Sequence, residues 1–244
     1  MTVSVRHYRG MVALSGAGLP ADIEEFRVTA RARLAEFPYL EVPEAAGIRR
    51  AAVLLCVVAQ EDGRPAVIVI KRAYRGRNAG QWGLPGGRLD DGETAVRAAI
   101  RELREELSLT AAPEDVVGRL DDFPATSGFA ITPFVAVLAD ASALLASPDE
   151  VHSVHLVDLA RLAAEDVPRW VRAGEAVRQA DLPEDAGSTV APDRGLLQMR
   201  LAPTMTIHAP TGAMLWQFRE VLLLGSPAER ARIADFAQPE WTRH

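Results

Sequence analysis

Cysteine is almost absent from the sequence, since Cys56 is the only one among 244 residues. A single thiol cannot form an internal disulfide, and Cys56 lies in the apolar run from Ala51 to Val58, so we expect a buried and unreactive side chain. The sequence also has no apolar stretch near the ~20 residues of a membrane span, and no basic start followed by an apolar signal region. We therefore expect a cytoplasmic protein that does not contact a membrane.

An excess of positive charge is missing as well. The 27 Lys and Arg residues are outnumbered by 33 Asp and Glu residues, which gives a formal net charge of -6. This balance argues against a general nucleic-acid binder, although it leaves room for a local basic pocket that binds a phosphorylated small molecule. No internal repeat is found. A chain of 244 residues is long enough for one sizeable domain with additions, or for two small ones.

The most informative stretch runs from residue 86 to residue 109. It opens with a glycine pair, Gly86 and Gly87, and continues to an isolated acid, Glu93. The segment from Thr94 to Ser108 contains no Gly or Pro and is rich in Ala, Leu, Arg and Glu, so it predicts a helix. Four apolar residues form a stripe that should attach this helix to a core: Val96, Ala99, Leu103 and Leu107.

The predicted helix carries an acidic face. At about 100° per residue, Glu102, Glu105 and Glu106 share one narrow side. Like charges at this spacing repel by roughly 0.2–0.5 kcal/mol per pair. A solvated acidic face is the simpler interpretation of a glutamate cluster seen alone. The glycine pair and Glu93 at fixed spacing favour instead a site for a hard divalent cation such as Mg²⁺, which binds carboxylate oxygens and bridges substrate phosphates.

This spacing resembles the signature of the Nudix hydrolases, Gly-x5-Glu-x7-Arg-Glu-U-x-Glu-Glu-x-Gly-U, in which U is aliphatic. The second glycine of the signature is replaced by Ser108. That position lies at a helix end, where a left-handed conformation is easier for Gly than for Ser. The remaining fixed positions all match the signature: Gly87, Glu93, Arg101, Glu102, Leu103, Glu105, Glu106 and Leu109.

The resemblance implies an enzyme that hydrolyses a nucleoside diphosphate linked to another moiety, with water and Mg²⁺ or Mn²⁺. It implies that Glu102 and Glu105 are catalytic, with one glutamate of the set accepting the proton of the water, while Arg101 holds a glutamate in place. The implied metal ligands are the Gly86 carbonyl and the carboxylates of Glu93, Glu102, Glu105 and Glu106. The implied partner is a small-molecule nucleoside diphosphate.

Two further segments bear on the substrate. The basic loop from Arg72 to Gly80 precedes the glycine pair, and its guanidinium groups suit phosphate oxygens. We expect three arginines of this loop to bind substrate: Arg72, Arg75 and Arg77. The segment after the helix, Leu120 to Phe123 followed by Ser127 to Val135, resembles that of coenzyme A pyrophosphatases. Leu84 stands where that family has Phe, and the arginine loop is one residue shorter.

Three hypotheses follow. The first is hydrolysis of coenzyme A or a CoA thioester, giving 3′,5′-ADP and a 4′-phosphopantetheine. The second is the same chemistry on ADP-ribose or another dinucleotide. The third is a non-catalytic Nudix-like domain that senses a nucleotide, and the intact set of glutamates argues against it because a binding module does not need them.

The resemblance and the pattern of apolar runs predict an α/β fold, a Nudix-type α/β/α sandwich with a mixed sheet over residues 48–225. Residues 1–47 are predicted to be an extension with a helix from Ala21 to Phe37, for packing or for forming a homodimer. Residues 226–244 are predicted to be a tail. The segment from Glu165 to Pro203 reads as a long loop over the site, with a short helical piece near Trp170 to Val177.

Overall fold

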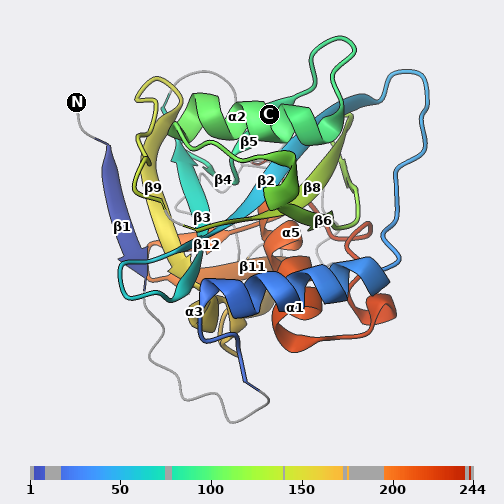
Figure 1. The fold of residues 1–244 in the computed structure, drawn as a ribbon. Helices are drawn as coiled ribbons and strands as arrows, with labels where there is room; N and C mark the ends of the chain where they lie inside the picture. Colours follow the sequence, from blue (N-terminus) through green and yellow to red (C-terminus); the bar gives the residue numbers. More distant parts are fainter. Residues whose placement is uncertain are drawn as a thin grey trace.

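The fold is a mixed β-sheet between two layers of helices, as a computed structural model shows (Figure 1). The structure describes residues 3–8, 18–74, 79–139, 141–172, 175, 195–239 and 242. Within this part of the chain the main sheet has nine strands, with the order β1-β9-β3-β2-β8-β6, and with β4, β5 and β7 paired to β3, β2 and β8 respectively. The strands are β1 (Ser4–Tyr8), β2 (Arg49–Ala59), β3 (Pro65–Arg72), β4 (Trp82–Gly83), β5 (Gly86–Arg88), β6 (Val116–Arg119), β7 (Phe123–Ala125), β8 (Phe129–Leu138) and β9 (Val151–Asp158).

Strand β2 explains why the sheet lies in the middle of the molecule. Its side chains alternate between two apolar clusters, with Leu55 and Val57 on one face and Leu54 and Cys56 on the other. A strand that is buried on both faces needs a nearly continuous apolar sequence, which this one has. Cys56 is fully buried, and burial raises the pKa of its thiol to about 12, so the prediction of an unreactive thiol is confirmed.

Helix α2 (Ala95–Leu107) covers one face of the sheet, and Leu103 and Leu107 pack against it there. The opposite face is covered by α1 (Ile23–Glu36), α3 (Leu159–Ala163) and α5 (Thr211–Phe218), which continues into the π-helical turn η2 (Arg219–Leu224). The described residues also contain two shorter 3₁₀ turns, η1 (Pro113–Asp115) and η3 (Ala228–Arg230). The predicted α/β/α sandwich is therefore confirmed. No helix in the described residues combines the length and the apolar character that crossing a membrane requires.

A small second sheet corrects one prediction. Trp170 was expected in a short helical piece, but it lies in β10 (Pro168–Arg172), which pairs antiparallel with β11 (Gly195–Ala202). Strand β12 (Met205–Ile207) completes this sheet. The local sequence could not show this because the partner of Trp170 is Leu197, which is distant in the chain. Val171 and Arg172 lie in the same strand, and the remainder of the predicted helical piece, apart from Glu175, lies outside the described residues.

The N-terminal segment shares the sheet and the core. Strand β1 adds a parallel edge to β9, and α1 buries Phe26, Ala30 and Leu34 against the face opposite α2. Asp22 caps α1, since its side chain accepts hydrogen bonds from the backbone of the first turn. The boundaries after residues 47 and 225 stay predictions.

Candidate active site

The glycine pair forms the turn at which the sheet meets α2. Gly86 pairs with Val53 in register and has φ of 150°, so a side chain there would collide with the backbone of β2. A Cβ on Gly87 would collide with the carboxylate of Glu102. Gly86 therefore requires glycine, because only glycine lets the turn approach the backbone of β2 this closely, whereas a side chain at Gly87 would displace the Glu102 carboxylate from beside the turn.

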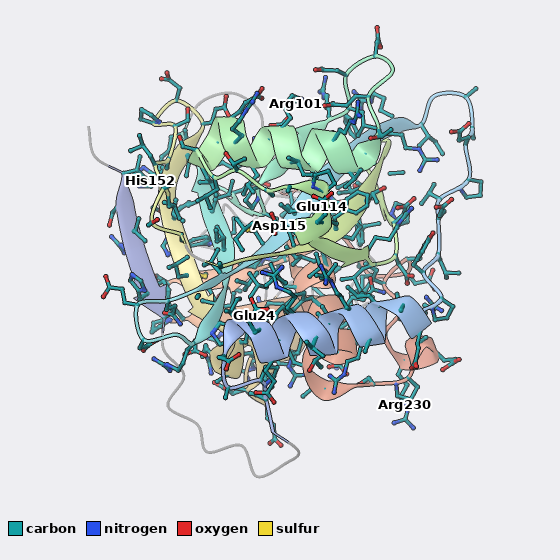
Figure 2. The ribbon with its side chains drawn as sticks, viewed as in Figure 1. Glu24, Arg101, Glu114, Asp115, His152 and Arg230 are labelled. Atoms are coloured by element: carbon teal, nitrogen blue, oxygen red, sulfur yellow. The ribbon has the colours of Figure 1, made fainter. Side chains whose placement is uncertain are left out.

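Arg101 lies on α2 (Figure 2) and holds several carboxylates at once. Its Nε and Nη2 donate to the two carboxylate oxygens of Glu93 at 3.0 and 2.9 Å. Its Nη1 donates to Glu102 and Glu105, both at 3.0 Å. These bonds lower the pKa of Glu93 below its usual range. The geometry agrees with a positioning role for Arg101, and no observation shows it touching a substrate.

Glu106 is the most deeply buried acid of the set, with a side chain that is 0% exposed. Its Oε2 accepts a hydrogen bond from the backbone N–H of Gly86 at 3.1 Å. Its Oε1 lies 3.3 Å from Nη2 of Arg72 but has no partner with hydrogen-bond geometry. Burial raises the pKa of Glu106 to about 8, although Arg72 opposes the shift. A carboxylate that is buried and incompletely bonded is costly unless something else compensates it.

The other two glutamates of this face are progressively more accessible. The side chain of Glu102 is 16% exposed, and burial raises its pKa, although the hydrogen bond from Arg101 opposes this. The side chain of Glu105 is 46% exposed. The three carboxylates thus extend from the buried edge of the sheet to the solvent along one side of α2.

The donor chemistry of this face fits a hard divalent cation, because it offers carboxylate oxygens and one of them, Oε1 of Glu106, is buried without a hydrogen bond. In the part of the chain that the structure describes, however, no three His, Cys, Asp or Glu side chains converge as metal ligands would. Arg101 instead neutralises Glu93, Glu102 and Glu105. The ligand set therefore stays a prediction, and a cation would have to compete with Arg101 for two or three of these carboxylates.

Helix α2 ends at Leu107, and Ser108 adopts the left-handed conformation with φ of 57°. Its backbone N–H donates to the carbonyl of Arg104 at 2.9 Å. This is the position at which the signature has glycine, and Ser108 is the only residue other than glycine with positive φ among the described residues. The backbone of the signature is thus kept without its glycine.

A cavity of about 1080 Å³ opens beside the glycine turn. The main sheet contributes Gly86, Gly87 and Arg72 to its wall, and the small sheet contributes Gln198 and Thr206. The cavity thus begins at the turn that faces α2 and extends toward the segment from β11 to α5. Part of the predicted long loop therefore does line the candidate site. The polar stretch from Asp181 to Asp193 lies outside the described residues.

Of the three predicted substrate-binding arginines, the structure describes one. Arg72 lines the cavity, where it pairs with Glu106. Arg75 and Arg77 lie outside the described residues. Sequence analysis missed two other arginines of the cavity wall, Arg49 and Arg88.

Arg49 and Arg88 share one aromatic contact. Their guanidinium carbons lie 4.0 and 5.1 Å from the ring centroid of Phe129. Arg49 is opposite Phe129 in the register of β2 and β8, and Arg88 is opposite Ala51 in the register of β5 and β2. Only this strand pairing brings them together, and the sole signal in the sequence is that Arg88 directly follows the glycine pair.

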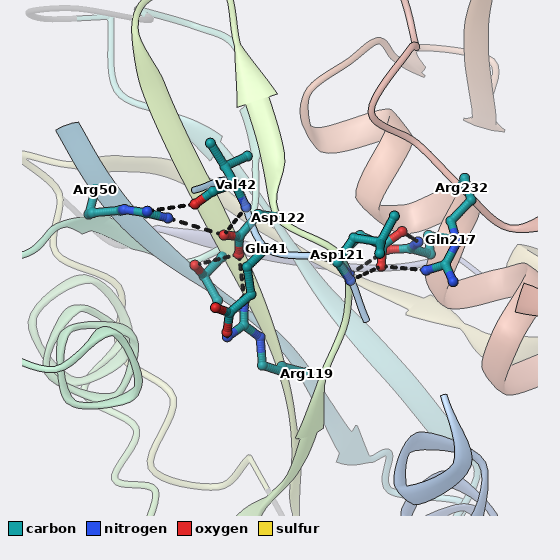
Figure 3. Close-up of polar contacts among 10 residues, drawn as sticks. Glu41, Val42, Arg50, Arg119, Asp121, Asp122, Gln217 and Arg232 are labelled. Carbon is teal, nitrogen blue, oxygen red and sulfur yellow. Dashed lines mark hydrogen bonds and ion pairs between the residues drawn. The ribbon is translucent and has the colours of Figure 1, made fainter. Parts of the chain in front are cut away.

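In the segment that resembles coenzyme A pyrophosphatases, the side chain of Asp122 is held by several hydrogen bonds. Asp122 is 4% exposed, and both of its oxygens are paired (Figure 3). One accepts from Arg119 at 2.6 Å and from Thr132 at 2.8 Å. The other accepts from the backbone of Val42 at 3.0 Å and from Arg50 at 3.2 Å. This acid therefore ties the segment before β2 to β8.

Asp121 makes a second set of bonds in the same region (Figure 3). Its Oδ1 accepts from the backbone of Leu40 at 2.7 Å and from Arg232 at 2.8 Å, and its Oδ2 accepts from Gln217 at 2.8 Å. Neither Asp121 nor Asp122 is among the residues that line the cavity. The two acids join the N-terminal segment, the sheet, α5 and the C-terminal segment, whereas Ser127, Phe129 and Ile131 of the same motif line the cavity.

Comparisons with known proteins agree with this geometry. The family model described as the NUDIX domain matches residues 48–184, which is more than half of the chain. The chain belongs to the Nudix family.

Among individual proteins, the chain is similar to one named "Uncharacterized Nudix hydrolase NudL" from Cronobacter sakazakii, with 38% identity over 114 residues. That match covers 46% of this chain and 58% of the relative. The protein of the same name from Escherichia coli K12 is 34% identical over 115 residues, covering 46% of this chain and 59% of the relative. The chain thus spans less than two thirds of the length of these relatives. Among solved structures, a Nudix hydrolase from M. smegmatis, RenU, aligns with 25% identity and a TM-score of 0.37 over 49% of this chain and 76% of that chain.

Proposed function

We propose that the chain hydrolyses the diphosphate of a nucleoside diphosphate linked to another group, with Mg²⁺ or Mn²⁺. The observation that carries this proposal is that the glycine turn lines the cavity and also contacts Glu102 and Glu106 on α2, with Oε1 of Glu106 buried and without a hydrogen bond. An acidic cluster that only stabilised the helix would pair this oxygen or expose it to water.

The residues that would hold the cations are the Gly86 carbonyl and the carboxylates of Glu93, Glu102, Glu105 and Glu106. When bound, the cation neutralises phosphoryl charge and activates the attacking water. Competition by the cation for Glu102 and Glu105 would leave Arg101 on Glu93, to which it donates two bonds. Arg101 would therefore keep Glu93 in position while the cation takes its place on Glu102 and Glu105.

The chain itself supplies the general base and the phosphate contacts. Glu102 is suited to accept the proton of the water because burial raises its pKa toward the neutral range. Glu105 is the alternative base, and its exposure makes it accessible to water. Arg72 lines the cavity next to Gly86 and would contact the diphosphate, since guanidinium groups suit phosphate oxygens. Arg49 and Arg88 would bind a further anionic group of the ligand.

We propose coenzyme A or a CoA thioester as the substrate, with 3′,5′-ADP and a 4′-phosphopantetheine as products. The cavity supports this, because about 1080 Å³ is at the upper end of small-molecule sites and accepts a long ligand. The arginine pair supports it too, because coenzyme A carries a phosphate beyond its diphosphate. ADP-ribose or another dinucleotide is the alternative substrate. A cytoplasmic location and a homodimer stay predictions.

The test is hydrolysis by the purified chain with Mg²⁺ or Mn²⁺, measured by chromatography of the nucleotide products. Coenzyme A, acetyl-CoA, ADP-ribose and diadenosine diphosphate are compared at equal concentration. We expect Glu105→Gln to reduce turnover at least about 100-fold with the fold retained, because the amide keeps the volume and removes a charge that binds cations. The matched control is Glu24→Gln, on α1 across the sheet from α2, which should not change the rate (Figure 2). Near wild-type turnover of Glu105→Gln at saturating Mg²⁺ would exclude this role for Glu105.

A further inference from the structure

Two buried glutamines beside the core differ in how completely their side-chain amides are hydrogen-bonded. Gln217 is 0% exposed, accepts from the backbone of Asp121 at 3.0 Å, and donates to the Asp121 carboxylate and the Ala231 carbonyl at 2.8 and 2.7 Å. Gln198, on β11, is 1% exposed, and its Nε2 lies 3.3 Å from Nε2 of His208. Its Oε1 has no hydrogen-bond partner among the described residues.

The position of Gln198 in the molecule relates this difference in hydrogen bonding to ligand binding. Gln198 lines the cavity, whereas Gln217 does not. A buried amide oxygen without a partner loses its hydration and gains nothing in return. Such an exception in a native protein calls for an explanation, and a ligand that donates a hydrogen bond in the cavity provides one.

Among the described residues, the wall around Gln198 carries no charged side chain. Burial lowers the pKa of His208 to about 4, so this ring is neutral at pH 7. The small sheet and the start of α5 contribute hydroxyl and apolar groups to the same wall, including Thr206, Thr211 and Met214. Among the described residues that line the cavity, the charged ones are three arginines, all on strands of the main sheet: Arg49, Arg72 and Arg88.

The two walls therefore suit a ligand with two chemically different parts. The arginine wall fits phosphate groups, and the wall formed by the small sheet and α5 fits an uncharged arm. A neutral wall would not compensate a second anionic group, because burying an unpaired charge is costly.

We propose that the wall formed by the small sheet and α5 is a subsite for an uncharged, hydrogen-bonding arm of the ligand, and that Gln198 selects this arm by accepting an N–H or O–H. The identity of the anionic part as a diphosphate rests on the proposed function. The selection by Gln198 rests on the cavity and on its own unpaired oxygen.

The test measures binding, with ligands that cannot be hydrolysed. Three methylene-bridged diphosphate analogues are titrated by calorimetry in the presence of Mg²⁺: one of dephospho-coenzyme A, with amide N–H donors, one of ADP-ribose, with hydroxyl donors, and one of ADP ethyl ester, with no donor on the arm. The wild-type chain should prefer one donor-bearing arm over the ethyl arm, and the preferred arm shows whether the donor is an amide or a hydroxyl.

Substitution then isolates the acceptor. Gln198→Leu should reduce the preference for the donor-bearing arm at least about 10-fold, since leucine has similar volume and no acceptor. Gln198→Asn keeps an uncharged amide acceptor on this strand and should retain more of the preference than Gln198→Leu. Equal losses on all three ligands in Gln198→Leu, or a wild-type chain without preference among the arms, would overturn the proposal.

A stability measurement separates selection from a packing role. Gln217→Leu should lower the melting temperature because it leaves bonded partners unpaired, whereas Gln198→Leu should leave it unchanged or raise it. An equal drop in both variants would show that Gln198 is structural and would overturn the proposal.

Hydrolysis of the natural diphosphates is measured separately. Selective binding without hydrolysis would contradict the proposed function and support the subsite. Hydrolysis with no selection by Gln198 would support the proposed function and contradict the subsite.

Discussion

Two acidic clusters in this molecule differ in how completely their carboxylates are bonded. In the pair formed by Asp121 and Asp122, every carboxylate oxygen accepts at least one hydrogen bond. On α2, Glu106 is equally buried, yet its Oε1 has no hydrogen-bond partner and burial raises its pKa to about 8. The comparison teaches that acidity and burial alone do not indicate function. What separates the two clusters is the unbonded acceptor on Glu106, because a fully bonded carboxylate leaves no acceptor for a ligand.

The comparison also changes how the sequence around Leu120 to Phe123 is interpreted. Its resemblance to coenzyme A pyrophosphatases suggested a link to the substrate. In the structure its two acids hold together segments that are far apart in the chain, and they do not line the cavity. In this chain the two acids therefore stabilise the fold, and the part of the motif that lies at the cavity is Ser127, Phe129 and Ile131.

The largest expected effect is on stability, at the fully bonded cluster. Asp122→Ala should lower the free energy of unfolding by about 3–5 kcal/mol, because it leaves Arg50 and Arg119 without their buried partner. Urea denaturation followed by circular dichroism measures this. A loss below about 1 kcal/mol would show that the cluster is no more important than an exposed ion pair.

A second prediction extends the comparison to a buried histidine. His155 is 2% exposed, its Nδ1 has no hydrogen-bond partner among the described residues, and burial lowers its pKa to about 4. Its folded-state pKa is therefore below the unfolded value of about 6.5, and the unfolded chain binds the extra proton. Stability should be fully present above pH 6.5 and should fall as the pH drops toward 4, with a slope of at most about 1.4 kcal/mol per pH unit from this group.

The control for this prediction is His155→Gln, which has no titrating ring. Urea midpoints measured from pH 7 to pH 4 should fall less steeply in the variant than in the wild-type chain. His208 is retained in both chains, so its contribution cancels. If the urea midpoint falls with pH equally steeply in the variant and in the wild-type chain, His155 is protonated to the same extent in the folded and the unfolded chain.

The smallest expected effect is at the end of α2. Ser108→Gly should stabilise the chain by about 0.5–1 kcal/mol, because φ of 57° is easier for glycine, although glycine also gives the unfolded chain more freedom. Hydrolysis should not change, since Ser108 contributes only backbone geometry. Thermal unfolding and the rate of hydrolysis are measured on the same preparation. A decrease in stability would mean that the serine side chain makes a favourable contact that glycine loses.

Local features were predicted well from the sequence. The helix expected from Thr94 to Ser108 is observed from Ala95 to Leu107, because composition and apolar periodicity act within a few turns. The glycine pair was also recognisable, and at Gly86 the backbone of β2 leaves no room for a side chain. Strand β10 was missed because its partner, β11, is separated from it by more than twenty residues of chain.

The rest of the site depends on tertiary structure. Arg49 and Phe129 are far apart in the sequence and meet only through the register of β2 and β8. The missing partner of Gln198 cannot be read from any pattern, because it is a property of the cavity and not of the neighbouring residues. Sequence predicts which groups can do the chemistry, whereas the selection of the ligand depends on contacts between distant strands.

The most direct test of the difference between the two clusters is the affinity for Mn²⁺, measured by electron paramagnetic resonance in the absence of nucleotide. The wild-type chain, Glu106→Gln and Asp122→Asn are compared under conditions in which circular dichroism shows all three to be folded. We predict that Glu106→Gln weakens Mn²⁺ binding at least about 10-fold, because it removes a carboxylate ligand, and that Asp122→Asn binds like the wild-type chain. Equal affinity of Glu106→Gln and the wild-type chain, or an equal loss in both variants, would contradict the assignment of the cation site to α2.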